Sequence, residues 1–494
     1  MPHVRPAEYV VPDPAFELQY VELIHRHHKR TPYASNAFPV ESYTWDCDDS
    51  RLYLYGESVL GKKATPVFRK GHTSSFNPFV PSGWIGSCNF PQITSSGLDD
   101  SWQHGADLNA VYHGMLGFLP AKGSDYKSVV RYRVTNNVIT SQVAGMIING
   151  MWSTSDPFPL IVEALGVDSL EPQYSCGTAE ALFNDIKSNR NPEWQKHLDA
   201  SANLFSALDG ISGVPASDGG FHSSFDHYYD NLSARQCHAK PLPCKLLDGH
   251  NSTSCVSQKH ADAVYRMGNW EYSQIYRDHP SSLPASALSL GIWIGELVIH
   301  LRDVISGSST TRYFHNIAHD GSVSRLLSIL QIDEMVWPGM GSEVVFELYK
   351  RKEHVPNPHP SSPLAAPSCR HDNCLRHMIR HFTSVNTLCH NLPDPSSISP
   401  TPALPFPSEC SDHPQLSSAC ACWSNLPTAS PLPSNGPSSK PSGYYIRVLF
   451  GGKVFQSSNP NLGRLDMVPA EVLLDYLEAL VGKSGGAIKS KCQS

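Results

Sequence analysis

The stretch LQYVELIHRHHKRTP, residues 18–32, decides the fold, because a strand pattern runs directly into a cluster of basic residues. Residues 18–25 are rich in β-branched and aromatic side chains and have the length of a strand. Residues 24–32 contain three histidines, two arginines and one lysine. In α/β sheets, ligands bind beyond the carboxyl ends of strands. The cluster therefore stands where such a fold carries a site.

Three interpretations of this cluster compete: a metal site, an anion-binding site and a solvated basic face. A metal site is disfavoured, because Arg26, Lys29 and Arg30 would repel a cation. Arginine matches the geometry of phosphate oxygens. A histidine among arginines stays neutral and nucleophilic, because nearby positive charge disfavours the imidazolium form. The pattern favours an anion such as a phosphoryl group, and a solvated loop stays open as the alternative.

A second motif, AHDG at residues 318–321, follows the strand pattern RYFHNIA of residues 312–318. It places His319 and Asp320 immediately before the helical pattern of residues 322–332. A helix N-terminus favours anions, and a carboxylic acid there could protonate a leaving oxygen.

In their order along the chain, the two motifs resemble those of the histidine acid phosphatases, the acid-phosphatase and phytase branch of the histidine phosphatase superfamily. In that family a strand leads into R-H-G-x-R-x-P and a later strand leads into H-D. This chain has RHHKRTP at residues 26–32 and His319-Asp320. The strand pattern of residues 342–349 and the hairpin pattern YYIRVLFGGKVF of residues 444–455 also resemble the later elements of the family.

The resemblance implies an α/β fold of the phosphoglycerate mutase-like kind, a mixed sheet with flanking helices and an inserted, mostly helical cap. We expect the core to comprise residues 1–140, 305–353 and 443–494, and the cap to comprise residues 141–304. Residues 354–442 are rich in proline and serine and lack hydrophobic periodicity. That composition predicts a disordered insertion or an artefact of the gene model.

The Pro/Ser-rich segment also contains a set of residues that mimics a zinc site: Cys369, Cys374, His377 and His381. The gap between the cysteine pair and the histidine pair is far shorter than in a zinc finger. Chance clustering is therefore the favoured interpretation.

The resemblance further implies a phosphomonoester hydrolase that acts through a phosphohistidine. His27 would attack phosphorus, and Asp320 would give its proton to the departing oxygen. Arg26, Arg30 and His319 would bind the phosphoryl oxygens. We expect no metal and no cofactor, and a small-molecule phosphate ester as the partner.

Two departures from the family pattern bear on activity. The glycine after the nucleophilic histidine is His28 here, whose ring would narrow the pocket or contribute to it. The family's third phosphate-binding arginine falls on Ile139 in an alignment without gaps, and a lost charge-assisted contact costs about 1.5–3 kcal/mol. Asn136 and Asn137 could supply neutral donors or cap the following helix.

These departures motivate an alternative, a catalytically weakened or repurposed relative that binds an anionic metabolite. A further option is phosphoryl transfer between positions of one substrate, as in mutases.

Composition sets the remaining expectations. A formal net charge of −7 and a pI near 6.4 give no reason to expect a nucleic-acid partner. The most apolar run, residues 283–301, includes Glu296 and His300 and is not expected to span a membrane. The start lacks the apolar core of a secretory signal, so the sequence as written predicts a cytoplasmic protein, or a secreted one if an upstream signal exon is missing.

Three cysteines close together in the sequence, Cys237, Cys244 and Cys255, could form one disulfide in an oxidising compartment. The sequence does not indicate an oligomeric state.

Overall fold

The structure is a computed structural model that describes residues 2–40, 44–54, 56, 61, 64–72, 74, 76–79, 83–352 and 442–493. The predicted Pro/Ser-rich segment 354–442, except for its last residue, lies outside the described residues, and so does the zinc-like set within it.

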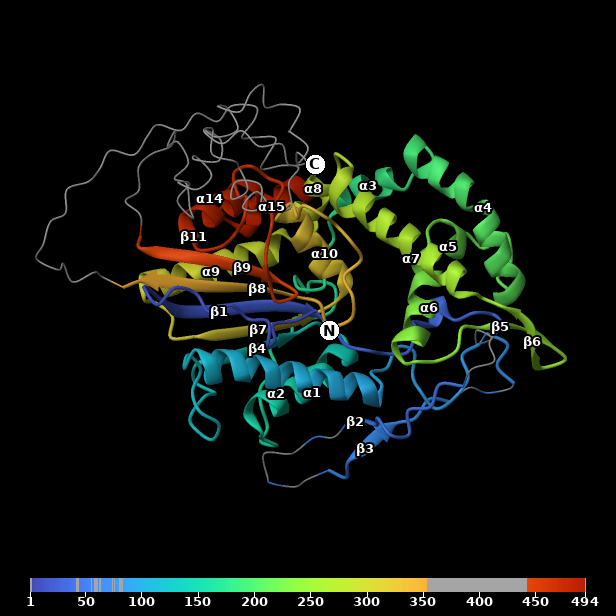
Figure 1. The fold of residues 1–494 in the computed structure, drawn as a ribbon, viewed down its shortest axis with the longest axis horizontal. Coiled ribbons are helices and arrows are strands. Elements are labelled where there is room, and N and C mark those ends of the chain that lie inside the picture. Colours follow the sequence, from blue (N-terminus) through green and yellow to red (C-terminus); the bar gives the residue numbers. More distant parts are fainter. Residues whose placement is uncertain are drawn as a thin grey trace, which may run out of the picture. The chain divides into compact units, whose positions relative to one another are not determined.

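A seven-stranded mixed sheet forms the centre of the fold (Figure 1). The strand order is β10–β9–β8–β1–β7–β4, and β11 pairs with β9. Strands β1, β7 and β4 are mutually parallel, whereas β8 and β9 run antiparallel to their neighbours. The strands are β1 Phe16–Arg26, β4 Val130–Val134, β7 Tyr313–Ala318, β8 Glu343–Arg351, β9 Tyr444–Phe450, β10 Lys453–Val454 and β11 Val468–Pro469.

Both faces of the sheet are covered by helices, and β1 shows how the sequence produces this. Tyr20 and Ile24 point into one hydrophobic core, whereas Val21 and Leu23 point into another. Side chains alternate between the two faces of a strand, so a strand buried on both faces is almost continuously hydrophobic. The predicted mixed sheet with flanking helices is confirmed.

The helices on the two faces come from different parts of the chain (Figure 1). The face of Val21 is covered by α1 Ser95–Asn109 and α2 Val138–Trp152. The opposite face is covered by α8 Ser282–Ser289, α9 Gly291–Ser306, α10 Asp320–Ile329, α14 Ala470–Val481 and α15 Gly485–Cys492.

The chain between β4 and β7 is mostly helical. It contains α3 Gly177–Ile186, α4 Pro192–Ser212, α5 Gly219–His222, α6 Asp226–Cys237, the hairpin of β5 Cys244–Leu247 and β6 His250–Cys255, α7 Gln258–Ser273 and the π-helix η3 Gln274–Asp278. Helices α4, α6 and α7 share a third hydrophobic core. Most of α9 and most of α2 fall within the predicted cap segment 141–304 but pack on the sheet, and the domain boundaries themselves stay a prediction.

Four short elements complete the described chain: the 3-10 helix η1 Ala34–Asn36, the hairpin of β2 Leu52–Leu54 and β3 Val67–Arg69, and the π-helix η2 Ala110–Met115. Within the described ranges, no single helix is both long and apolar enough to cross a membrane. Helices α8 and α9 reach that length and apolarity only as a pair, which is bent by 67°.

Three disulfides connect described cysteines: Cys47–Cys88, Cys176–Cys492 and Cys244–Cys255. The last one closes the β5–β6 hairpin, and Cys237 is free. Of the three cysteines that the sequence offered for one bond, the structure therefore pairs the second and third. The Cys176–Cys492 bond ties the segment before α3 to the end of α15, across 316 residues.

We expect the double variant Cys176→Ser/Cys492→Ser to be less stable by about 2–4 kcal/mol, because a bond that closes a long loop restricts the unfolded chain. Urea unfolding without reductant measures the loss, and peptide mapping of unreduced protein from the native source shows whether the bond forms. Cys237→Ser is the control and should leave the unfolding midpoint unchanged. Equal midpoints for the double variant and the wild type would contradict the prediction.

Candidate active site

Two parallel strand ends bring the two sequence motifs together. Arg26 is the register partner of Ala318, so the residues that follow them emerge at the same edge of the sheet. The His27 backbone N–H donates to the Ala318 carbonyl (3.0 Å), and the His27 and His319 ring centroids are 5.5 Å apart. Arg26 Nη2 lies 3.0 Å from Asp320 Oδ2. The predicted nucleophile and the predicted proton donor thus belong to one group, in which His27 is buried and Asp320 is partly exposed.

The protonation of His27 follows from its hydrogen bonds. Its Nδ1 lies 3.0 Å from the His28 carbonyl oxygen, which can only accept, so Nδ1 carries the proton. The other nitrogen, Nε2, keeps its lone pair and accepts a long contact from Arg30 Nε (3.4 Å). Burial lowers the pKa of His27 well below its usual value, and Arg30 and Arg26 lower it further. The ring is therefore a neutral imidazole with an unprotonated Nε2, which is the form that attacks an electrophile.

Both predicted phosphate-binding arginines already have carboxylate partners. Arg26 is paired with Asp320 and donates from Nη1 to the Pro338 carbonyl (2.7 Å). Arg30 Nη2 lies 3.0 Å from Asp230 Oδ1. Asp230 comes from α6, where no sequence motif marked it as part of a site. The two cations are thus held in position and also partly neutralised.

The end of β4 supplies a third group to the same edge. Thr135 directly follows β4, and its Oγ1 lies 2.9 Å from His319 Nε2. Glu171 Oε1 lies 3.3 Å from the same nitrogen. Burial lowers the pKa of His319 to about 4, although Asp320 opposes this shift, and burial together with Asp168 raises the pKa of Glu171 to about 7. Sequence reasoning missed Thr135 and Glu171; only the parallel position of β4 could have pointed to the threonine.

The residues discussed in connection with the family's third phosphate-binding arginine lie next to this edge of the sheet. Ile139 is fully buried in the core beneath α2. Asn137 caps α2, since its side chain accepts from the Ile139 N–H (3.3 Å). The Asn136 side chain donates to the Glu163 carbonyl (2.9 Å), and its backbone N–H donates to Asp168. Asn137 thus has the capping role that the sequence offered as one alternative, and phosphate binding by either asparagine stays a prediction.

Asp320 is held at the N-terminus of α10 by donors on both oxygens. Its Oδ1 accepts from the Gly321 N–H (2.9 Å), and its Oδ2 accepts from Trp337 Nε1 (2.9 Å). The indole of Trp337 is stacked between Tyr229 and Tyr272, with ring centroids 3.9 and 4.1 Å away. An indole clamped on both faces fixes the position of the N–H that it donates, so the carboxylate is preorganised.

Opposing effects set the ionisation of Asp320. Burial by itself would raise the pKa of the carboxyl, but Arg26, the Trp337 hydrogen bond and Arg30 together lower it to about 2. In the absence of a ligand the carboxyl is therefore ionised at neutral and mildly acidic pH, as suits an anion at a helix N-terminus.

His28 belongs to a different group of side chains. Its ring is completely buried and packs against His25 and His104, with His28 Nε2 3.2 Å from His104 Nδ1. A contribution of His28 to the phosphate pocket stays a prediction.

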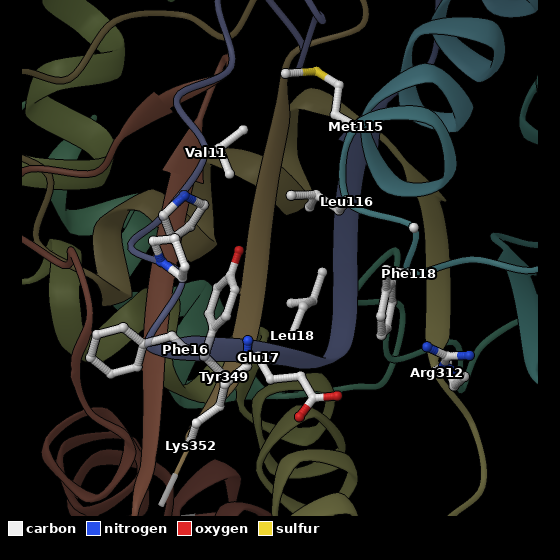
Figure 2. Close-up of a pocket in the computed structure, with 13 residues that line it drawn as sticks. Val11, Phe16, Glu17, Leu18, Met115, Leu116, Phe118, Arg312, Tyr349 and Lys352 are labelled. Carbon is white, nitrogen blue, oxygen red and sulfur yellow. The ribbon is translucent and has the colours of Figure 1, made fainter. Parts of the chain in front are cut away.

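A pocket of about 320 Å³ lies at the opposite end of β1 (Figure 2). Its lining includes Phe16, Leu18, Leu116, Phe118 and Tyr349, and the predicted site residues are not among the residues that line it.

The comparisons with known proteins agree with this geometry. Prostatic acid phosphatase from Homo sapiens is 22% identical over 345 residues, covering 64% of this chain and 85% of the relative. Lysophosphatidic acid phosphatase type 6 from Bos taurus is 22% identical over 343 residues, covering 68% and 75%. These acid phosphatase relatives support the histidine acid phosphatase family for this chain. The predicted family is thus confirmed.

The chain is also similar to a protein whose name does not mention a phosphatase, and to two phytase structures of low sequence identity. Counting factor 60 from Dictyostelium discoideum is 26% identical over 347 residues, covering 67% of this chain and 76% of the relative. A phytase from Hafnia alvei in complex with myo-inositol hexakis sulphate superposes with a TM-score of 0.46 at 11% identity, covering 69% and 82%. A phytase from Klebsiella sp ASR1 gives 0.42 at 14%, covering 68% and 80%. No family model matches the chain.

We expect Asp320→Asn to lower the free energy of unfolding by about 2 kcal/mol at pH 7, because the pKa of this carboxyl falls from 3.8 to about 2 on folding. A carboxyl whose pKa is lower in the folded chain than in the unfolded chain stabilises the fold at pH values above the unfolded-chain pKa. This stabilisation is lost as the pH falls through the folded-chain pKa. The difference between wild type and variant should therefore shrink from about pH 4 toward about pH 2.

Denaturant unfolding across this pH range measures the difference. Asp100→Asn is the control, since Asp100 makes a more exposed ion pair with Lys29 (2.9 Å) and should cost less than about 1 kcal/mol. A difference for Asp320→Asn that does not change with pH would contradict the assignment of its pKa.

Proposed function

We propose that this protein hydrolyses small-molecule phosphate monoesters through a phosphohistidine on His27. Its phosphatase relatives support phosphomonoester hydrolysis in general. The observation that carries the finer proposal is the neutral His27 ring, whose Nε2 lone pair lies beside Arg30 and whose centroid is 5.5 Å from that of His319. Preorganised donors around a transferring phosphoryl group are usually the largest source of rate enhancement.

The proposed reaction has two steps. In the first, His27 Nε2 forms a bond to phosphorus while the ester P–O bond breaks, and the departing oxygen takes a proton from Asp320. In the second, a water oxygen forms a bond to phosphorus while the N–P bond breaks, and the proton of the water returns to Asp320. Arg26, Arg30 and His319 bind the phosphoryl oxygens in both steps.

Asp320 needs a proton before it can give one, although its pKa is low in the free protein. A phosphate dianion bound to Arg26 would compete for the cation that lowers this pKa and would add negative charge beside the carboxyl. Both changes raise a carboxyl pKa. We propose that substrate binding itself loads Asp320 with its proton. Glu171 is the rival donor, because its pKa of about 7 keeps it protonated in acid.

A second candidate function is favoured by the charge balance of the site. Asp230 and Asp320 each neutralise one arginine, and Ile139 stands where the alignment expected a third. Such a site attracts a dianion less strongly than one with unpaired arginines. This supports a weakened or repurposed relative that binds an anionic metabolite without turnover.

The disulfides support a further proposal about location. Disulfides persist in oxidising compartments and are rare in the cytosol. We propose that the protein matures in an oxidising compartment, contrary to the expectation from its sequence as written. The mapping experiment given for Cys176 and Cys492 tests this.

We expect His27→Ala to reduce hydrolysis of p-nitrophenyl phosphate at acidic pH by at least about three orders of magnitude, because the nucleophile is lost. Rapid acid or alkaline quench with ³²P-labelled substrate should trap an acid-labile, alkali-stable adduct in wild type only. His250→Ala, a change at an exposed histidine, is the control and should leave both readouts intact. Ligand binding without turnover by wild type would favour the second candidate instead.

We expect Asp320→Asn to slow hydrolysis of an alkyl phosphate by about 10²–10⁴-fold, and to slow that of p-nitrophenyl phosphate much less. The reason is that an alkoxide needs a proton to depart, whereas nitrophenolate does not. Steady-state rates for both substrates measure the contrast, and Glu171→Gln is the matched carboxyl variant. If Glu171→Gln shows this leaving-group dependence and Asp320→Asn does not, the proton donor is misassigned.

A further inference from the structure

Three histidines form a compact group beside the nucleophile. His25 lies near the end of β1, His28 lies in the loop after β1, and His104 lies in α1. One ring nitrogen from each residue lies within 4.8 Å of those from the other two. All three side chains are completely buried. Imidazole nitrogens that converge inside a protein from three separate elements are suited to binding a metal ion.

The hydrogen bonds outside this group leave lone pairs directed into it. His25 Nδ1 lies 2.8 Å from the Arg26 carbonyl oxygen, so Nδ1 carries the proton and Nε2 keeps a lone pair. That Nε2 has no hydrogen-bond partner in the described chain. His104 Nε2 lies 2.9 Å from Glu343 Oε2; if it donates to this carboxylate, His104 Nδ1 keeps its lone pair, 3.2 Å from His28 Nε2.

We propose that His25, His28 and His104 bind a divalent transition-metal ion, with zinc as the best match. Zinc binds imidazole nitrogen at about 2.0–2.1 Å, so two nitrogens on one tetrahedral ion are about 3.4 Å apart. The 3.2 Å between His28 and His104 is close to that spacing, and the His25 nitrogen, within 4.8 Å of both, would have to move closer on binding.

The surroundings supply the second layer of contacts that a metal-binding histidine needs. A carboxylate or carbonyl that accepts from the other ring nitrogen orients the ligand and raises its basicity. Glu343 does this for His104, and the Arg26 carbonyl does it for His25. Glu343 is itself oriented by the backbone N–H of Val4. His25 is therefore already fixed in the required tautomer, and an ionised Glu343 would fix His104 in it as well.

The charge argument against a metal fails in the folded chain. From the sequence alone, the neighbouring cations of the RHHKR run were expected to repel a metal ion. In the structure each of them has a carboxylate partner: Arg26 with Asp320, Lys29 with Asp100, and Arg30 with Asp230. The positive charge of the run is therefore compensated outside the histidine group.

Two further carboxylates would offset the charge of the ion. Glu343 is completely buried beside His104. His3 stacks on His104 with ring centroids 4.2 Å apart, and its Nε2 lies 2.8 Å from Asp107 Oδ2. A dication between the rings would favour the ionised forms of both carboxyls.

The ion would have a structural role. It would tie the end of β1 to α1 and, through Glu343, to β8 (Glu343–Arg351), and so brace the backbone that presents Arg26 and His27. No step of the proposed hydrolysis passes through it. The inference therefore does not depend on the proposed function.

In the experiment, the full chain is unfolded with a chelator and then refolded with or without one equivalent of zinc. Mass spectrometry then measures the zinc bound to the refolded protein. We expect about one ion per wild-type chain after refolding with zinc, and a rise in the thermal midpoint that zinc-free protein lacks. His25→Gln and His104→Gln should lose the ion. His315→Gln is the control, since this ring is equally buried and contacts the same group, but His315 lies outside the ligand set.

Zinc-edge X-ray absorption of the wild type gives a readout that does not depend on any variant folding. It should show imidazole nitrogens in the first shell. Failure to take up zinc on refolding, a first shell without imidazole, or equal zinc loss in His315→Gln and His104→Gln would overturn the proposal. His27→Ala should keep the ion while losing turnover, which separates failure of this proposal from failure of the proposed hydrolysis.

Discussion

The parallel pairing of β1 with β7 is the constraint on which the rest of the site depends. With Arg26 opposite Ala318, the next residues of both strands leave the sheet at the same edge and in the same direction. A shift of the pairing by one residue would exchange the faces of His25 and Arg26, because side chains alternate along a strand. His27, the proposed nucleophile, would then lose its neighbours.

The basic run divides into two groups with different chemistry, and strand alternation alone does not produce them, because His27 and His28 follow the end of β1. Arg26 and His27 face Asp320 and His319, whereas His25 and His28 join His104 of α1. Each cation of the run is matched by a carboxylate from another part of the fold. Charge that looks excessive in the sequence is therefore locally balanced in the structure, and the nucleophilic ring is held neutral mainly by burial.

The local sequence pattern predicted most strands of the sheet and about half of the residues that form the candidate site. The strand and helix patterns around residues 18–26, 312–332 and 342–351 correspond to β1, β7 with α10, and β8. The residues missed have no motif of their own. Asp230 and Glu171 come from the long segment between β4 and β7, and an alignment without gaps led to Ile139 while Thr135 contacts His319. Such partners are chosen by proximity in space, which a linear pattern does not encode.

The sequence by itself indicated the family and the mixed α/β architecture and predicted five conspicuous candidate site residues, because strand length, hydrophobic alternation and short motifs are local properties of the chain. The tertiary structure decided the environment of those residues. The tautomer of His27, the low pKa of Asp320, the pairing of both arginines and the convergence of three histidines all arise from burial and from contacts between distant segments. Electrostatic effects depend on distance and on exclusion of water, and only the folded chain sets either one.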